Sequence, residues 1–130
     1  MLFRSRQPVQ AGGFADEPVG PEVEWQPALD IYEAADSFLL VFALPGVRAQ
    51  DVEAMVADRA FVVTGTRHVP LPDGVRAHLI ESARGTFERR IRLPGSADLT
   101  GLRTELTNGQ LLVQIPKRRT GTIRIRVTSA

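Results

Sequence analysis

The sequence predicts an all-β fold, a single antiparallel β-sandwich, from three observations. A chain of 130 residues fits one domain. Residues 38–44 form a short apolar run that Pro45 and Gly46 end, which is typical of a buried strand. Asn108 and Gly109 stand between two segments that alternate apolar and polar residues, and this pair favours a tight hairpin turn. Short strands joined by frequent turns indicate a sandwich.

Composition divides the chain into three regions. Residues 1–25 are rich in proline and glycine, and their isolated apolar residues follow no period, which predicts a flexible N-terminal arm. Residues 26–117 carry the strand pattern and are expected to form the domain. Residues 118–130 form a basic tail that ends in another alternating segment.

Further strands are expected on both sides of the middle of the domain. Residues 61–64 are short and β-branched, and Gly65 ends them. Residues 102–107 and 111–115 alternate on the two sides of the hairpin turn, and Pro116 ends the second of them.

One segment, residues 49–57, has an ambiguous pattern. Val52 and Val56 fit the spacing of a helix face, and the helix propensity of the segment is good. The same residues also alternate as they would in a strand. Periodicity alone leaves both interpretations open.

Arg89 is the most informative charged residue of the sequence. If residues 87–93 form a strand, Arg89 lies on the same face as three apolar residues. A lone buried guanidinium is costly, so Arg89 should have a carboxylate partner or lie at an interface. Glu81 is the first candidate for this partner. The alternative is a bulge that turns Arg89 back to water.

The sequence contains no recognisable catalytic or metal-binding motif. The absence of cysteine excludes disulfides and thiolate metal sites. The two histidines, His68 and His78, lie in a predicted loop without a metal-binding spacing. There is neither a Gly-x-Ser-x-Gly nucleophile elbow nor a phosphate-binding loop. We therefore expect a binding protein rather than an enzyme, with no metal and no cofactor.

Charge and hydropathy limit the possible partners and location. The net charge of +1 argues against a dedicated nucleic-acid-binding protein. The longest apolar run, residues 38–44, is too short to cross a bilayer as a helix. The arginines near the N-terminus are not followed by the apolar stretch of a signal peptide. We expect a cytoplasmic protein that contacts no membrane.

Four motifs resemble, in order, those of the α-crystallin domain of small heat shock proteins of the bacterial type. Individually they are weak, but together they span residues 27–125 at sensible spacing. They are Pro27-Ala28-Leu29-Asp30-Ile31-Tyr32-Glu33 with Leu44-Pro45-Gly46-Val47, Gly85-Thr86-Phe87-Glu88-Arg89 with Leu93-Pro94, Asn108-Gly109-Gln110-Leu111 with Pro116-Lys117, and Ile123-Arg124-Ile125.

The resemblance implies an immunoglobulin-like sandwich in which residues 49–57 form a strand. It also implies a dimer that forms by exchange of a strand from the long loop of residues 67–84, with residues 76–80 as the exchanged strand. The residues that it places at the dimer interface are Arg76, His78, Ile80, Glu81 and Arg89.

The resemblance further implies a docking site for the tail. Ile123 and Ile125 would bind in a groove of a neighbouring dimer, and Ile125 with Val127 is an alternative pair. The residues expected to line this groove are Ala54, Val56, Leu102 and Thr104.

The activity that the resemblance implies is that of an ATP-independent holdase, a homo-oligomer that binds partly unfolded client proteins and prevents their aggregation. The apolar residues of the arm that are expected to contact clients are Phe3, Phe14, Val19 and Trp25. The alternative is a sandwich that acts as a co-chaperone or adaptor for one specific protein. Such an adaptor needs neither the exchanged loop nor the tail motif, and both are present here.

Overall fold

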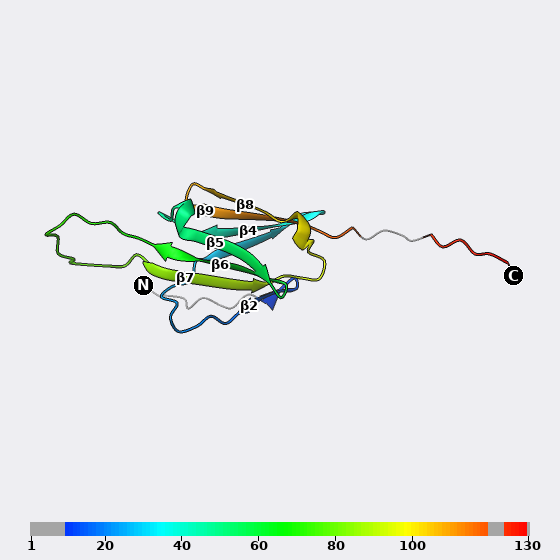
Figure 1. Cartoon of the computed structure of the whole chain (residues 1–130), viewed down its shortest axis with the longest axis horizontal. Helices are drawn as coiled ribbons and strands as arrows, with labels where there is room; N and C mark the ends of the chain where they lie inside the picture. Colours follow the sequence, from blue (N-terminus) through cyan, green and yellow to red (C-terminus); the bar gives the residue numbers. More distant parts are fainter. Residues whose placement is uncertain (1–9, 120–123, 130) are drawn as a thin grey trace.

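The computed structural model describes residues 10–119 and 124–129, and the chain folds into two stacked antiparallel sheets (Figure 1). The prediction of an all-β sandwich is confirmed. The five-stranded sheet contains, in spatial order, β1 (Gln10–Ala11), β2 (Phe14–Glu17), β7 (Gly85–Arg92), β6 (Ala60–Arg67) and β5 (Val52–Ala57). The four-stranded sheet contains β3 (Leu29–Glu33), β4 (Ser37–Ala43), β9 (Gln110–Pro116) and β8 (Arg103–Thr107). Two short 3-10 turns are η1 (Ala49–Asp51) and η2 (Leu99–Gly101).

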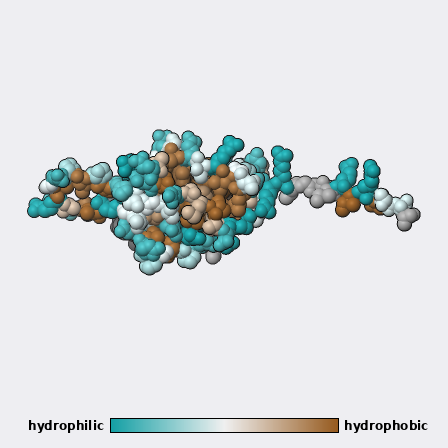
Figure 2. Space-filling model, in the orientation of Figure 1, coloured by the Kyte–Doolittle hydropathy of each residue, from teal (hydrophilic) through white to brown (hydrophobic). Residues whose placement is uncertain are grey.

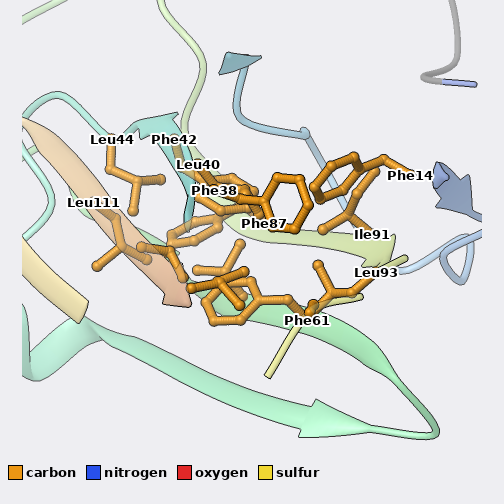
Figure 3. Packing of buried hydrophobic residues seen from close by; sticks show 14 of the residues in the cluster. Phe14, Phe38, Leu40, Phe42, Leu44, Phe61, Phe87, Ile91, Leu93 and Leu111 are labelled. Atoms are coloured by element: carbon orange, nitrogen blue, oxygen red, sulfur yellow. The ribbon is translucent and has the colours of Figure 1, made fainter. Parts of the chain in front are cut away.

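The core lies between the two sheets and follows the alternation of the strands. Phe38, Leu40 and Phe42 point inward from β4, because successive residues of a strand face opposite sides of the sheet. The ring of Phe42 stacks on that of Phe61 from the other sheet, with their centroids 5.6 Å apart. Figure 3 shows these side chains packed with Phe87, Ile91 and other apolar residues into one cluster.

The ambiguous segment, residues 49–57, forms the short turn η1 and then strand β5. Ala54 pairs with Val63 and Val56 with Phe61, so β5 completes one edge of the five-stranded sheet. Pairing with β6 therefore outweighs the helix propensity of the segment. The hairpin closes through Asp58 and Arg59, whose φ angles of 49° and 63° give the tight turn that joins antiparallel strands.

The N-terminal arm is more ordered than the sequence indicates. Residues 1–25 are expected to be flexible, but β1 and β2 form a hairpin that extends the five-stranded sheet through pairing of β2 with β7. Gly12 and Gly13, with φ angles of 61° and 84°, make its two-residue turn. Strands of two and four residues are too short to produce a periodic pattern, so the Gly-Gly pair was the only signal in the sequence.

Among the residues that the structure describes, no helix is long and apolar enough to cross a membrane.

The turn η2 gives a pH-dependent contribution to stability through Asp98. Its carboxylate accepts hydrogen bonds from the hydroxyl and the amide of Thr100, and these bonds lower the pKa of Asp98 below 3.8. A carboxyl group whose pKa is lowered on folding stabilises the native state above its unfolded pKa, and this contribution disappears as the pH falls through the folded pKa.

We expect Asp98→Ala to lower the urea midpoint of unfolding at pH 7, because the substitution removes Oδ1, the oxygen that accepts both hydrogen bonds from Thr100. The difference from wild type should shrink as the pH falls below 3.8. Asp73→Ala, in an exposed loop, is the control and should leave the midpoint unchanged. A difference that grows with acidification would contradict this account.

Candidate functional site

The sandwich is open along one side, where β5 and β8 are the edge strands of the two sheets. On the opposite side Phe14 and Ala11 line a hollow together with Leu29 and Ile31 of β3, so β3 lies beside the β1–β2 hairpin. The edges formed by β5 and β8 must therefore lie together on the other side. In Figure 1 both strands face the viewer, and Figure 2 shows apolar surface on this side of the molecule.

The predicted groove residues lie on or beside the two edge strands of this open side, which we call the β5–β8 groove. Ala54 and Val56 pair with buried residues of β6, so their side chains point toward the interior, although the four-stranded sheet leaves them exposed. Thr104 pairs with the buried Val113 and also points inward. Leu102 packs against the core beside these residues. The register thus turns side chains of both edge strands inward, where Ala54, Val56 and Thr104 remain exposed, and the groove itself stays a prediction.

The C-terminal tail makes no packing contact with the sandwich in the described segment. Ile125 and Val127 are 78% and 91% exposed, and the tail extends away from the two sheets (Figure 1). Figure 2 shows hydrophobic surface on one side of this segment and hydrophilic surface on the other. Ile123 lies outside the described residues. The docking of the tail therefore stays a prediction.

Strand β3 has an unpaired backbone edge. The amide of Ala43 donates to the carbonyl of Ala28, and the amide of Ala34 donates to that of Ser37. Because hydrogen-bonded and non-hydrogen-bonded positions alternate in an antiparallel pair, the amides and carbonyls of Leu29, Ile31 and Glu33 point away from β4. An added strand would find these groups free to pair.

The long loop between β6 and β7 extends away from the sandwich (Figure 1). The residues that were predicted to form the exchanged strand, among them Arg76, His78 and Ile80, are exposed and are not part of a strand in the isolated chain. The base of the loop is held by Arg67, whose guanidinium donates to the carbonyl oxygens of Pro45 and Ala83. The exchange itself stays a prediction.

Arg89 is buried, with 1% of its surface exposed, as the strand pattern predicted. Its Nε donates to Oδ1 of Asp16 over 3.1 Å and its Nη2 to Oδ2 over 2.9 Å, which makes a bidentate pair. Its Nη1 donates to the carbonyl of Pro27 over 2.9 Å. The regular pairing of β7 with β6 at this position excludes the alternative of a bulge.

The choice of Glu81 as the partner of Arg89 within the chain was wrong. Glu81 lies in the exposed loop, whereas the β1–β2 hairpin brings Asp16 to the guanidinium. The sequence argument missed Asp16 because it treated residues 1–25 as an unstructured arm. A role of Arg89 and Glu81 at a dimer interface is not tested by the single chain.

The arm residues that were expected to contact clients are not uniformly exposed. Phe14 is 4% exposed and packs edge-on against Phe38, with the ring centroids 5.2 Å apart. Trp25 is half-buried, packs against Phe87 with the two rings tilted, and donates from Nε1 to the carbonyl of Gly85. Val19 is half-buried. Phe3 lies outside the described residues. In the single chain Phe14 thus belongs to the core, and the contact of these residues with clients stays a prediction.

The two histidines show no arrangement for catalysis or metal binding. His68 lies 3.7 Å from the carboxylate of Asp51, and His78 is exposed in the long loop. Within residues 10–119 and 124–129, no group of three or more histidine, aspartate or glutamate side chains could hold a metal ion.

Comparison with known proteins agrees with this geometry. A sandwich of two antiparallel sheets with a long β6–β7 loop has the fold of α-crystallin domains. The profile of the Hsp20/alpha crystallin family matches residues 30–128, and the chain belongs to this family. Small heat shock proteins of the family are ATP-independent chaperones and not enzymes.

Plant and bacterial proteins are similar to the chain. The 16.9 kDa class I heat shock protein 1 of Triticum aestivum is 32% identical over 119 residues, which cover 88% of this chain and 75% of that protein. The small heat-shock protein of Xylella fastidiosa has 33% identity and a TM-score of 0.73, with coverage of 82% of this chain and 100% of that one. HspA of Xanthomonas axonopodis has 34% identity and a TM-score of 0.66, with coverage of 74% and 97%. The fold is therefore that of the bacterial small heat shock proteins.

We expect Arg89→Ala to lower the free energy of unfolding by about 3 kcal/mol, since it removes the bidentate pair with Asp16 and the buried guanidinium that makes it. Arg90→Ala is the matched control on the same strand, because its ion pairs with Glu17 and Glu88 are longer and more exposed. The Arg90→Ala substitution should lower the free energy of unfolding by less than about 1 kcal/mol. Urea unfolding followed by tryptophan fluorescence measures both. Equal losses of unfolding free energy in the two variants would mean that the buried Arg89–Asp16 pair stabilises the fold no more than an exposed ion pair does.

Proposed function

We propose that this protein is a holdase, which binds partly unfolded proteins through exposed apolar surface and prevents their aggregation without ATP. The observation that carries the proposal is the exposure of the inward-facing Ala54 and Val56 at the open edge of β5, among the residues that the structure describes. Exposed apolar surface that is bordered by strand edges suits an extended, apolar segment of an unfolding protein. The free energy of binding comes from removing apolar surface of both partners from water, so no nucleotide is needed.

At rest, the groove would be occupied by the tail of a neighbouring copy. Residues 123–127 alternate apolar side chains with arginines, which suits a strand added to an edge. The apolar pair that docks is Ile123 with Ile125, or Ile125 with Val127. Burial of two such side chains yields roughly 3–6 kcal/mol before the loss of chain entropy. A contact of this strength opens readily on warming and exposes the groove.

The basic unit of the assembly would be a dimer that forms by strand exchange. Residues 76–80 of one copy would pair with the free backbone edge of β3 in the other. Leu29 and Ile31 present unpaired amides and carbonyls there, beside a hollow of about 310 Å³. Glu81 of the exchanged loop would then approach the region of Arg89. The exposed apolar residues of the loop, Leu79 and Ile80, gain burial in this arrangement.

The arm would supply further client-binding surface when it is released. Val19 is only half-buried, and Phe3 belongs to the same region of the sequence. Phe14 and Trp25 pack against the sandwich at rest, so they would contact clients only after the β1–β2 hairpin separates from β7. We also propose a cytoplasmic location for the protein.

The holdase proposal predicts that the protein suppresses the light scattering of a thermally aggregating enzyme such as citrate synthase, without added ATP. Suppression should be substantial at equal subunit concentration, because binding requires only exposed apolar surface. An equal mass of lysozyme controls for crowding. Failure at several-fold excess would instead favour an adaptor with one specific partner.

The docking of the tail predicts that Ile125→Ser reduces the size of the assembly, since it removes an apolar residue common to both candidate pairs. Arg124→Ser is the matched control, because its side chain points away from the apolar side of the tail. Light scattering coupled to gel filtration measures the mass of each. If Ile125→Ser and deletion of residues 121–130 both leave the mass unchanged, the tail does not hold the assembly together.

A further inference from the structure

The outer face of the four-stranded sheet, which points away from the core, has an apolar centre. Strand register arranges the middle of this face in two rows that cross the sheet. The first row, from β3 to β8, is Tyr32, Leu39, Gln114 and Arg103. The second row is Asp30, Val41, Leu112 and Glu105.

The apolar centre is unusual for a sheet whose outer face meets water. Such strands normally alternate apolar and polar residues, but β4 is apolar on both faces. Leu39 is 36% exposed, and Val41 and Leu112 are half-buried beside it. A hollow of about 380 Å³ lies here, lined in part by Leu39, Leu112 and Glu105. The sequence of β4 is thus that of a strand covered on both sides.

Charged residues lie at the ends of the two rows. Arg103 and Glu105 are exposed neighbours on β8, at the ends of different rows. Asp30 ends the second row on β3, next to Tyr32, which is 56% exposed. Within the part of the chain that the structure describes, Arg103, Glu105 and Asp30 take part in no ion pair. The face therefore carries charges of both signs that are free to bind a partner.

We propose that this face binds the same face of a second copy of the chain, about a two-fold axis that crosses the strands between the two rows. This operation places each row over the other row of the partner. Arg103 then meets Glu105 of the second copy, and the reverse pair forms by symmetry. Leu39 meets Val41, and the hydroxyl of Tyr32 reaches the carboxylate of Asp30. Each of these contacts occurs twice.

Two orientations of a two-fold axis can stack these faces, and the charges favour the axis that crosses the strands over the axis parallel to them. A two-fold axis parallel to the strands would place each row on itself in reverse, so that Asp30 would meet Glu105 of the second copy. Two such carboxylate pairs would repel each other across the interface. The crossing axis converts the same residues into two opposite-charge pairs and buries the apolar centre between them.

The size of the face indicates a weak, reversible contact. Four strands at about 4.8 Å spacing and two rows at about 7 Å spacing give a patch of roughly 20 Å by 14 Å on each copy. Such a patch is smaller than that of a standard stable interface. The contact leaves the edge of β3 and the β5–β8 groove free, and it does not depend on the holdase activity. It would join units that other contacts have already formed.

The test uses charge reversal in the full-length protein. The weight-average sedimentation coefficient of the wild type should rise with protein concentration. This rise should be smaller for Arg103→Glu alone and for Glu105→Arg alone, because like charges then meet across the axis. An equimolar mixture of these two variants should regain much of the wild-type rise, since in a contact between the two different variants both charge pairs across the axis are of opposite sign. The double variant, Arg103→Glu with Glu105→Arg, should also behave as wild type.

Two controls separate this contact from others. Glu53→Arg, on the exposed part of β5, changes the net charge by the same amount as Glu105→Arg and should have no effect. Leu112→Thr should weaken the association, whereas Leu71→Thr in the exposed loop should not. The proposal is overturned if neither single charge variant lowers the rise, or if the mixture stays as low as its components. Restoration in the mixture cannot arise from a loss of folding or from tail docking.

Discussion

The buried ion pair of Arg89 and Asp16 is the constraint on which the arrangement of this molecule depends. A guanidinium in the centre of β7 is tolerated only where acceptors surround it, and the carboxylate of Asp16 and the carbonyl of Pro27 supply them. Asp16 belongs to β2, so the charge in the core attaches the N-terminal hairpin to the five-stranded sheet. The same hairpin brings Phe14 over Phe38 and closes one side of the sandwich.

This attachment determines which sides of the sandwich remain open. The β1–β2 hairpin protects the end of the core beside β3, yet it leaves the backbone edge of β3 unpaired. At the other side nothing in the described chain covers the inward-facing side chains of β5 and β8. The described chain therefore leaves exposed the backbone edge of β3 and the inward-facing side chains of β5 and β8. These two regions are the basis of the proposed self-association and client binding.

The sequence predicted those parts of the structure in which a strand has a recognisable pattern of its own, such as alternating residues or a hairpin turn. The alternation of residues 111–115 and the Asn108-Gly109 turn predicted β8 and β9, and the apolar face of residues 87–93 predicted the burial of Arg89. The partner of Arg89 was missed because it lies 73 residues away, on a strand of four residues with no periodic pattern. The exposed, apolar outer face of β4 was not predicted from the sequence, for a related reason. A continuous apolar run indicates burial on both sides but does not say what covers the second side.

The contacts of Arg67 with Pro45 and Ala83 also bear on how such a protein changes over evolution. Because Arg67 holds the base of the β6–β7 loop, the part of the loop beyond it can gain or lose residues without straining the strands. The entropy of closing a longer loop rises only slowly with its length. Insertions at the tip would alter how far the loop extends while the sandwich stays as stable as before. The distance that the loop extends and the stability of the sandwich can therefore change independently under mutation.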